Sequence, residues 1–328
     1  MGTKKNILFL LESKRGQSVS GEYIAGQLDI SRNAVWKAIK ELEKAGHKIK
    51  AVTGRGYMLC ENNDILSAEG MLSFLSDKQS ADKINIYSSL ETTNKTAKEM
   101  AVAGAAHGTA VLADSQTAGR GRYGRKFHSP PGTGIYISFV LRPEHLRIET
   151  PTLITAFAAV AVCEAIEAVS DKKPRIKWVN DIFLSGKKIC GISTEAVTDF
   201  ESGSMGWVVL GIGVNFSTPE ADFPEELRGI AGSVFPDGDP PITRNRLPAE
   251  IINRITAPQN QIPQKEMLEK YKSRLFMLGK RVLITGAKES CEAIATGIDD
   301  IGRLIVKKDT GEILLLSAGE ISTKCCQP

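Results

Sequence analysis

The chain has 328 residues, of which 42% are hydrophobic and 24% charged, a composition typical of a globular protein with two or three domains. We expect no membrane span, because no uninterrupted apolar run reaches about 18 residues. We expect no secretory signal, because charged residues directly follow the short apolar stretch near the start. The six cysteines have neither CxxC nor metal-ligand spacing, which favours free thiols in a cytoplasmic protein.

The net charge of +4 is unevenly distributed. Residues 1–63 hold eleven basic and six acidic residues, whereas the rest of the chain holds 31 basic and 32 acidic residues. This pattern predicts a small basic domain ahead of a near-neutral body, as in proteins that bind nucleic acid.

Residues 1–63 have the pattern of a helix-turn-helix domain. Helices are predicted over 4–13, 21–29 and 32–46, with Ser20 and Ser31 as N-caps of the second and third. Two short strands then flank a glycine-rich turn and would form a wing. The third helix has a polar, basic face suited to the major groove, although a helical domain that docks on a protein is the alternative. The candidate DNA-contacting residues are Ser31, Arg32, Asn33, Trp36, Lys37, Lys40 and Arg55.

Residues 114–126 form a glycine-rich, cationic segment. Gly119, Gly121 and Gly124 have the G-x-G-x-x-G spacing of dinucleotide-binding folds, but prolines and glycines follow where such folds need a helix, which excludes that interpretation. Residues 119–126 contain four cationic side chains and no acid. Because such a loop is costly to order alone, we expect it to fold over a phosphate-bearing ligand. A solvated basic loop or a second nucleic-acid contact is the alternative.

Three further segments combine apolar strands with polar groups. Residues 91–94 (Glu-Thr-Thr-Asn) lie where a strand meets a helix, and they could cap that helix or bind a neutral polar ligand group. Lys177 is predicted within a strand beside Asn180 and Asp181, facing either solvent or an anion. The strand that starts at 207 ends with Asn215, whose amide can pair with a base edge.

The order of elements predicts a central mixed, largely antiparallel sheet with helices on one side. Residues 151–170 are predicted to form a long buried helix within this unit. After Leu278, short apolar strands alternate with Gly/Asp turns, which predicts a small β-barrel. The four histidines lack metal-ligand spacing, so no zinc chemistry is expected.

Together these segments closely resemble one family, the bifunctional biotin–protein ligases that also repress the biotin operon. The four motifs that carry the resemblance, in the family's order, are residues 92–94, 119–125, 177–192 and 211–215. The resemblance implies a multidomain α+β protein whose central domain is class II synthetase-like. Its implied parts are a winged helix-turn-helix domain (1–63), a linker with a short helix (64–81), a biotin/ATP-binding catalytic domain (82–272) and an SH3-like C-terminal domain (273–328).

The resemblance also implies a two-step reaction. Biotin and ATP, with Mg²⁺, give biotinoyl-5′-AMP and pyrophosphate, and biotin then passes to a lysine on the biotin carboxyl carrier domain of a carboxylase. Because two anions must meet in the first step, fixed cations are expected to provide most of the catalysis. The catalytic candidates are Lys177, Arg120, Arg122 and Asp181. The biotin-binding candidates are Thr92, Thr93, Asn94, Gln116, Arg120, Arg122 and Lys177. The ATP- or adenylate-binding candidates are Gly119, Gly121, Arg122, Gly124, Arg125, Phe127, Lys177, Asn180 and Asn215.

The sequence departs from the family pattern at four positions. Val179 stands where proline is common, Tyr123 where a third arginine is usual, and Phe127 where tryptophan is frequent, while Glu91 in place of aspartate is a minor change. The regulatory expectation is that the adenylate orders residues 119–127 and favours a homodimer that binds a palindromic operator. Two alternatives are a non-catalytic transcription factor that senses biotin or its adenylate, and a ligase for lipoate or another acyl group.

Overall fold

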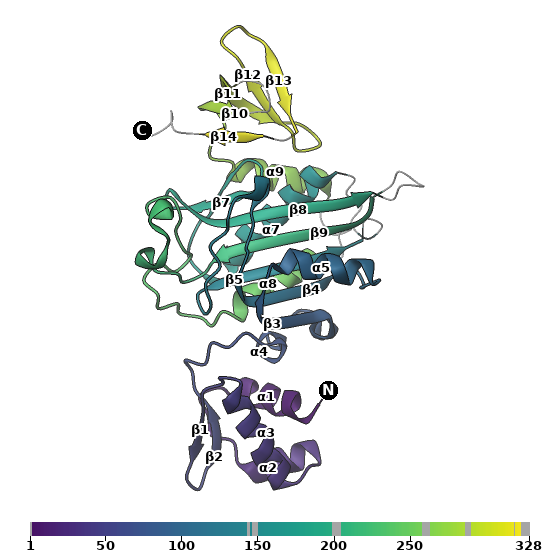
Figure 1. The fold of residues 1–328 in the computed structure, drawn as a ribbon, viewed down its shortest axis with the longest axis vertical. Helices are drawn as coiled ribbons and strands as arrows, with labels where there is room; N and C mark the ends of the chain where they lie inside the picture. Colours follow the sequence, from purple (N-terminus) through teal and green to yellow (C-terminus); the bar gives the residue numbers. More distant parts are fainter. Residues whose placement is uncertain are drawn as a thin grey trace.

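The computed structural model describes residues 2–142, 145, 150–198, 205–257, 263–285, 290–317 and 319–322. They form three units that follow one another along the long axis of the molecule: a helical N-terminal unit, a central sheet with helices and a C-terminal sheet (Figure 1). Cys60, Cys163, Cys190 and Cys291 are free thiols, and the second and third are buried. The prediction for Cys325 and Cys326 lies outside the described residues.

The N-terminal unit confirms the three predicted helices and both caps. Its elements are α1 (Thr3–Ser13), α2 (Gly21–Leu28), α3 (Arg32–Lys44), β1 (Ile49–Val52) and β2 (Gly56–Leu59). Ser20 accepts a hydrogen bond from the Tyr23 amide (3.0 Å) and Ser31 accepts one from the Ala34 amide (3.1 Å), as N-caps do. The apolar faces of the helices form a separate small core, and β1 and β2 pair as an antiparallel hairpin after α3.

The central unit is built on a seven-stranded sheet. Its strands are β3 (Ile84–Leu90), β4 (Thr109–Gln116), β5 (Gly134–Leu141), β6 (Arg175–Lys177), β7 (Asp181–Leu184), β8 (Lys187–Thr198) and β9 (Met205–Asn215). Its helices are α4 (Ala68–Leu72), α5 (Thr93–Val102), α7 (Pro151–Val169), α8 (Arg246–Thr256) and α9 (Gln264–Arg274), with short 3-10 turns η1 (Lys78–Lys83), η2 (Arg122–Gly124), η3 (Glu220–Asp222) and η4 (Glu225–Leu227). The strand order is β3-β4-β5-β9-β8-β7-β6, with β3 and β4 parallel and the other pairs antiparallel. The prediction of a mixed, largely antiparallel sheet is therefore confirmed.

Helices cover both faces of this sheet, so the prediction of helices on one side was wrong. Along β4, Ala110 and Leu112 join the main core with α7 and α8, whereas the intervening Val111 packs with Ala97 and Ala101 of α5. Because successive strand residues point to opposite faces, α5 lies on one face and α7 with α8 on the other (Figure 1).

The sequence predicted no apolar run long enough to span a membrane, but helix α7 has such a length and composition. Its 19 residues are long and apolar enough to cross a membrane, but 78% of that apolar window is buried within the central unit. Both charged residues of the helix, Glu164 and Glu167, form ion pairs with α9. The helix is the core helix predicted from the sequence.

The C-terminal unit is a five-stranded antiparallel sheet. Its strands are β10 (Arg281–Thr285), β11 (Cys291–Ile298), β12 (Leu304–Lys307), β13 (Ile313–Leu316) and β14 (Glu320–Ser322), in the order β13-β12-β11-β10-β14. In the part of the chain that the structure describes, no pairing joins β13 to β14, so the sheet does not close into the predicted barrel. The Trp178 indole donates a hydrogen bond to the Gly302 carbonyl (3.0 Å) and ties this unit to the central one.

Candidate functional site

The polar residues after β3 meet the end of β4 because these two strands are parallel neighbours. Leu90 pairs with Gln116 in the strand register. The amide and the hydroxyl of Thr93 lie 2.8 and 3.2 Å from Gln116 Oε1, and Gln116 Nε2 donates to Ser129 Oγ at 3.0 Å. Thr92 caps α5, accepting from the Lys95 amide at 3.0 Å. The amide of Gln116 is thus held in one orientation between two loops.

Asn94 fastens the first turn of α5 to the sheet. Its Oδ1 accepts from Ser138 Oγ (2.6 Å), and its Nδ2 donates to Ser193 Oγ (3.1 Å) and to Glu195 Oε1 (2.6 Å). A Cβ at Gly211 would collide with Asn94 Oδ1, so glycine makes room for this amide. Both amide protons of Asn94 are used within the protein, which indicates a positioning role for a residue predicted to bind biotin.

The cationic loop between β4 and β5 is closed by its own backbone. Phe127 donates an amide hydrogen bond to the Gly119 carbonyl (2.9 Å), and Gly121 donates to the Arg125 carbonyl (2.7 Å). A Cβ at Gly119 would lie 2.5 Å from both Phe127 O and Ser129 Oγ, so only glycine fits there. Between Gly124 and strand β5 the described residues form no α-helix, as the sequence predicted, so the segment lacks the helix of a dinucleotide-binding turn.

The side chains of this loop point in two directions. Arg120 and Arg125 are exposed, whereas Arg122 is half-buried and donates to Asn180 Oδ1 at 3.1 Å. Phe127 lies over the sheet, because a Cβ at Gly213 would be 2.6 Å from its ring and one at Gly191 would be 3.6 Å away. The glycines of β8 and β9 therefore form a flat seat for this ring.

Lys177 is the last residue of β6 and not a mid-strand residue as predicted. It is half-buried, with its ammonium 5.9 Å from the centroid of the Phe183 ring. Its register partner is Asp181, whose carboxylate forms an ion pair with Lys188 at 2.7 Å. The intervening turn contains a cis peptide bond between Trp178 and Val179. This corner thus combines Lys177, the register partner of Asp181, with an ion pair between Asp181 and Lys188.

Asn215 lies at the end of β9 and is 6% exposed. Its Nδ2 donates to the Gly232 carbonyl (2.9 Å), and its own carbonyl accepts from the Val234 amide (2.9 Å). In this structure Asn215 holds the 232–234 segment beside the sheet. Contact with adenine, as predicted from the resemblance, would use its remaining acceptor capacity.

The predicted DNA-contacting residues are exposed on the N-terminal unit. Arg32, Asn33, Trp36, Lys37 and Lys40 lie on the solvent-facing side of α3, with Trp36 49% exposed. Arg55 is exposed in the turn of the β1–β2 hairpin. Lys40 also pairs with Glu43 (2.7 Å), an interaction that a phosphate could replace.

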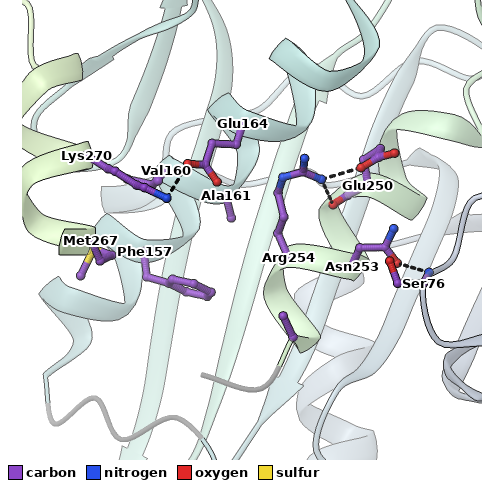
Figure 2. Close-up of a pocket in the computed structure, with 11 residues that line it drawn as sticks. Ser76, Phe157, Val160, Ala161, Glu164, Glu250, Asn253, Arg254, Met267 and Lys270 are labelled. Atoms are coloured by element: carbon purple, nitrogen blue, oxygen red, sulfur yellow. Dashed lines mark hydrogen bonds and ion pairs between the residues drawn. The ribbon is translucent and has the colours of Figure 1, made fainter. Parts of the chain in front are cut away.

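A cavity of about 330 Å³ lies between α7, α8 and α9 (Figure 2). Asn94 and Phe127 lie on the other face of the sheet, over Gly211 and Gly213, whereas the intervening Ile212 packs with α7. Its floor is apolar, with Phe157 and Val160. The charged groups at its rim pair with each other, Glu164 with Lys270 and Glu250 with Arg254. Both cations that line the cavity are therefore already paired with carboxylates.

Sequence reasoning missed several residues that hold the site together. Ser138 is fully buried in β5, where it lies 2.7 Å from the Thr93 hydroxyl. A serine within the otherwise apolar or aromatic run 134–141 was a usable signal. Lys188 and Glu195 had no comparable signal, because their partners Asp181 and Asn94 are brought near only by the sheet.

Family models match the chain in three successive parts. An HTH domain covers residues 3–58, the biotin/lipoate A/B protein ligase family covers residues 86–215, and a biotin protein ligase C-terminal domain covers residues 277–324. The fold and site therefore define a ligase-type catalytic domain joined to a helix-turn-helix domain.

Curated relatives match over nearly the whole length. The chain is 35% identical to the bifunctional ligase/repressor BirA of Bacillus spizizenii, over 96% of this chain and 97% of that protein. It is 29% identical to BirA of Escherichia coli, over 95% of each. Among solved structures, the biotin protein ligase of Aquifex aeolicus in complex with biotin and ATP superposes with a TM-score of 0.62 at 27% identity, covering 73% of this chain and 97% of that one. The chain belongs to the bifunctional ligase/repressor family of biotin protein ligases.

Proposed function

We propose that this protein joins biotin to AMP with ATP, transfers the biotinyl group to a lysine of a biotin carboxyl carrier domain, and represses transcription in response to biotin. The observation that carries the proposal is the meeting of a fixed neutral polar array, Thr93 with Gln116, and a cationic loop, residues 119–127, at one end of the central sheet. The full-length similarity to bifunctional ligase/repressors supports the same conclusion.

The polar array is assigned to biotin, and the cationic residues are assigned to the reacting carboxylate and phosphates. In this proposal Thr92, Thr93, Asn94 and Gln116 form or position the pocket for the neutral head group of biotin. The carboxylate of biotin attacks the α-phosphate of ATP, a bond forms between the carboxylate oxygen and phosphorus, and pyrophosphate leaves. Because both reactants are anions, Lys177 lowers the barrier by bridging the carboxylate and the α-phosphate.

The loop supplies the remaining positive charge. Arg120, Arg122 and Arg125 close over the phosphates, and the backbone at Gly119, Gly121 and Gly124 permits close approach. Phe127 and Asn215 contact the adenine, and Asn180 holds Arg122. Asp181, kept in place by Lys188, orients the incoming carrier lysine for the second step.

Mg²⁺ enters this proposal with its nucleotide. Among the described residues no group of three His, Cys, Asp or Glu side chains could hold a metal ion, and Asp181 is already paired with Lys188. The described residues therefore offer no dedicated site of this kind for the ion. Magnesium is expected to enter as the Mg·ATP complex.

The test of the enzymatic proposal is pyrophosphate release from ATP with biotin, lipoate or octanoate, with and without a carrier domain. Release with biotin alone among the three acids supports the proposal. Release with lipoate would make the protein a lipoate-type ligase, and no release with any acid would favour a non-catalytic sensor. Lys177→Met should abolish release, while Lys173→Met, an exposed lysine four residues earlier, should not.

The DNA-binding part of the proposal rests on the exposed face of α3. In it, α3 enters the major groove with Ser31, Arg32, Asn33, Trp36, Lys37 and Lys40, and the β1–β2 hairpin acts as a wing through Arg55. The adenylate orders residues 119–127 and favours a homodimer that binds a two-fold symmetric operator. Operator affinity should rise when biotin and ATP are both added, and equal affinity without them would contradict the proposal.

The proposed domain limits are 1–63, 64–81, 82–272 and 273–328. The matched ranges of the family models, 3–58, 86–215 and 277–324, fall within the first, third and fourth of these. A cytoplasmic location belongs to the same proposal, since ATP, the carrier and the operator are found together there.

A further inference from the structure

One buried arginine binds Asp64, the first residue after the helix-turn-helix domain. Arg244 precedes α8, and its side chain is 3% exposed. Its Nε donates to Asp64 Oδ2 (2.9 Å), one terminal nitrogen donates to the Asp64 carbonyl (2.9 Å), and its backbone amide donates to Asp64 Oδ1 (2.6 Å). The other terminal nitrogen donates to Asp114 Oδ1 (2.7 Å). A single guanidinium thus joins the start of the linker to strand β4.

The next residue along, Asn245, reinforces this attachment. Its Oδ1 accepts from the Ser67 amide (3.0 Å), and its Nδ2 donates to the Ile65 carbonyl (2.9 Å). Asn245 is fully buried, and a Cβ at Gly70 would lie 2.5 Å from its amide nitrogen. The start of the predicted linker is therefore a fixed element and not a free tether.

Each end of this connection reaches a functional part of the chain. Asn63, directly before Asp64, is fully buried in the N-terminal unit: its Oδ1 accepts from the Lys48 amide (2.9 Å) and its carbonyl from Arg15 (2.7 Å). At the other end, Asp114 lies two residues before Gln116 on β4, and it also accepts from the Gly132 amide (3.3 Å). The cationic loop starts three residues after Gln116.

We infer that Arg244 is a positioning residue that holds the helix-turn-helix domain in one orientation on the catalytic domain, and that it makes this orientation depend on ligand bound beside β4. Because a buried guanidinium without its carboxylate partners is costly, Arg244 should move with Asp114. A displacement of Asp114 should therefore change the contact between Arg244 and Asp64. The coupling to ligand rests on the proposed function, whereas the positioning of the linker does not.

The test is hydrogen–deuterium exchange of the full chain, comparing amides of residues 64–67 with amides of α3. In Arg244→Met we expect the 64–67 amides to exchange at least ten-fold faster than in the unaltered chain, with α3 unchanged. Arg254→Met is the matched control, because among the described residues the one ion pair of Arg254 is with Glu250 of its own helix. In this variant the 64–67 amides should exchange at the original rate. Asp64→Asn removes the charge of Asp64 and one of the two side-chain oxygens that accept from Arg244, and it leaves the pair between Arg244 and Asp114 in place. This variant serves where Arg244→Met does not fold.

Unchanged exchange at 64–67 in both Arg244→Met and Asp64→Asn would overturn the positioning role. Biotin with ATP should slow exchange at 64–67 at least three-fold in the unaltered chain, and should no longer do so in Asp64→Asn. Equal rates with and without biotin and ATP, in a sample that releases pyrophosphate, would overturn the coupling. A sample that releases no pyrophosphate would instead count against the proposed function, and the comparison without ligand would still decide the role of Arg244.

Discussion

Replacing Gly211 with alanine should weaken the ligand site indirectly, by displacing the side chain of Asn94. The new Cβ would overlap Asn94 Oδ1 and lie 2.7 Å from Ser193 Oγ, and real Cβ atoms do not come within 3.0 Å of other atoms. Asn94 must therefore leave its position and give up its bonds to Ser138, Ser193 and Glu195. Because the α5 N-terminus is fastened by these bonds, Gly211→Ala should displace the residues just before Asn94.

The expected cost follows from the hydrogen bonds that are lost. Two neutral bonds and one to a carboxylate contribute roughly 2–4 kcal/mol together, the lower part of their usual range because the carboxylate of Glu195 is two-fifths exposed. Urea unfolding should show this loss, and the KM for biotin should rise at least ten-fold. Gly206→Ala is a matched control on the same strand, since its Cβ would meet only the Val197 carbonyl at 3.7 Å.

A double substitution makes the reasoning refutable. If the clash with Asn94 is the main cause, Gly211→Ala combined with Asn94→Ala should lose much less stability than the sum of the two single losses, because only the contact with Ser193 Oγ remains. Additive losses in the double variant would refute the clash. A Gly211→Ala protein as stable as Gly206→Ala would refute the importance of the Asn94 bonds.

Three further predictions concern single groups. Burial raises the pKa of Cys163 to about 12, so a thiol reagent at pH 8 should label Cys163 at least 1000-fold more slowly than an ordinary thiol. Half-buried Cys60 should react in the same experiment, and fast labelling of Cys163 in the native protein would contradict the prediction. Burial, helped by nearby positive charge, lowers the pKa of His47, so the unfolded chain binds more protons than the folded one as the pH falls below ~6.5. The stability of the N-terminal unit should therefore fall on acidification. His47→Gln should flatten this pH dependence in urea unfolding, and an unchanged slope would refute the prediction. Lys188→Met should change the free energy of unfolding by no more than about 1 kcal/mol, because its ion pair with Asp181 is partly exposed. The same substitution should slow biotin transfer to a carrier domain, because Asp181 loses its partner. An unchanged transfer rate would count against the proposed role of Asp181.

Local patterns were enough to predict the N-terminal unit. Ser20 and Ser31 sit at caps that depend on a few neighbouring residues, and the apolar spacing of α3 fixes its buried face within one helix. The turn between β7 and β8 is also a local feature, since Ser185 and Gly186 both have positive φ, a conformation that glycine adopts without strain. By contrast, the face covered by α5 could not be read from α5 or β4 alone, since β4 is buried on both sides and its residues do not alternate in polarity.

The sequence by itself determined which chemistry is present: a basic helix-turn-helix unit, a loop of four cations among glycines, and polar residues where strands end. Those features are local, and charge, glycine content and capping are properties of short segments. Only the tertiary structure decided which of these residues meet. Hydrogen bonds join Asn94 to Glu195 across 101 residues and Asp64 to Arg244 across 180, and contacts of that separation depend on strand order and not on local pattern. The unequal charge of the two parts of the chain thus predicted a DNA-binding domain, whereas the buried guanidinium that fixes this domain on the catalytic one became visible only in the fold.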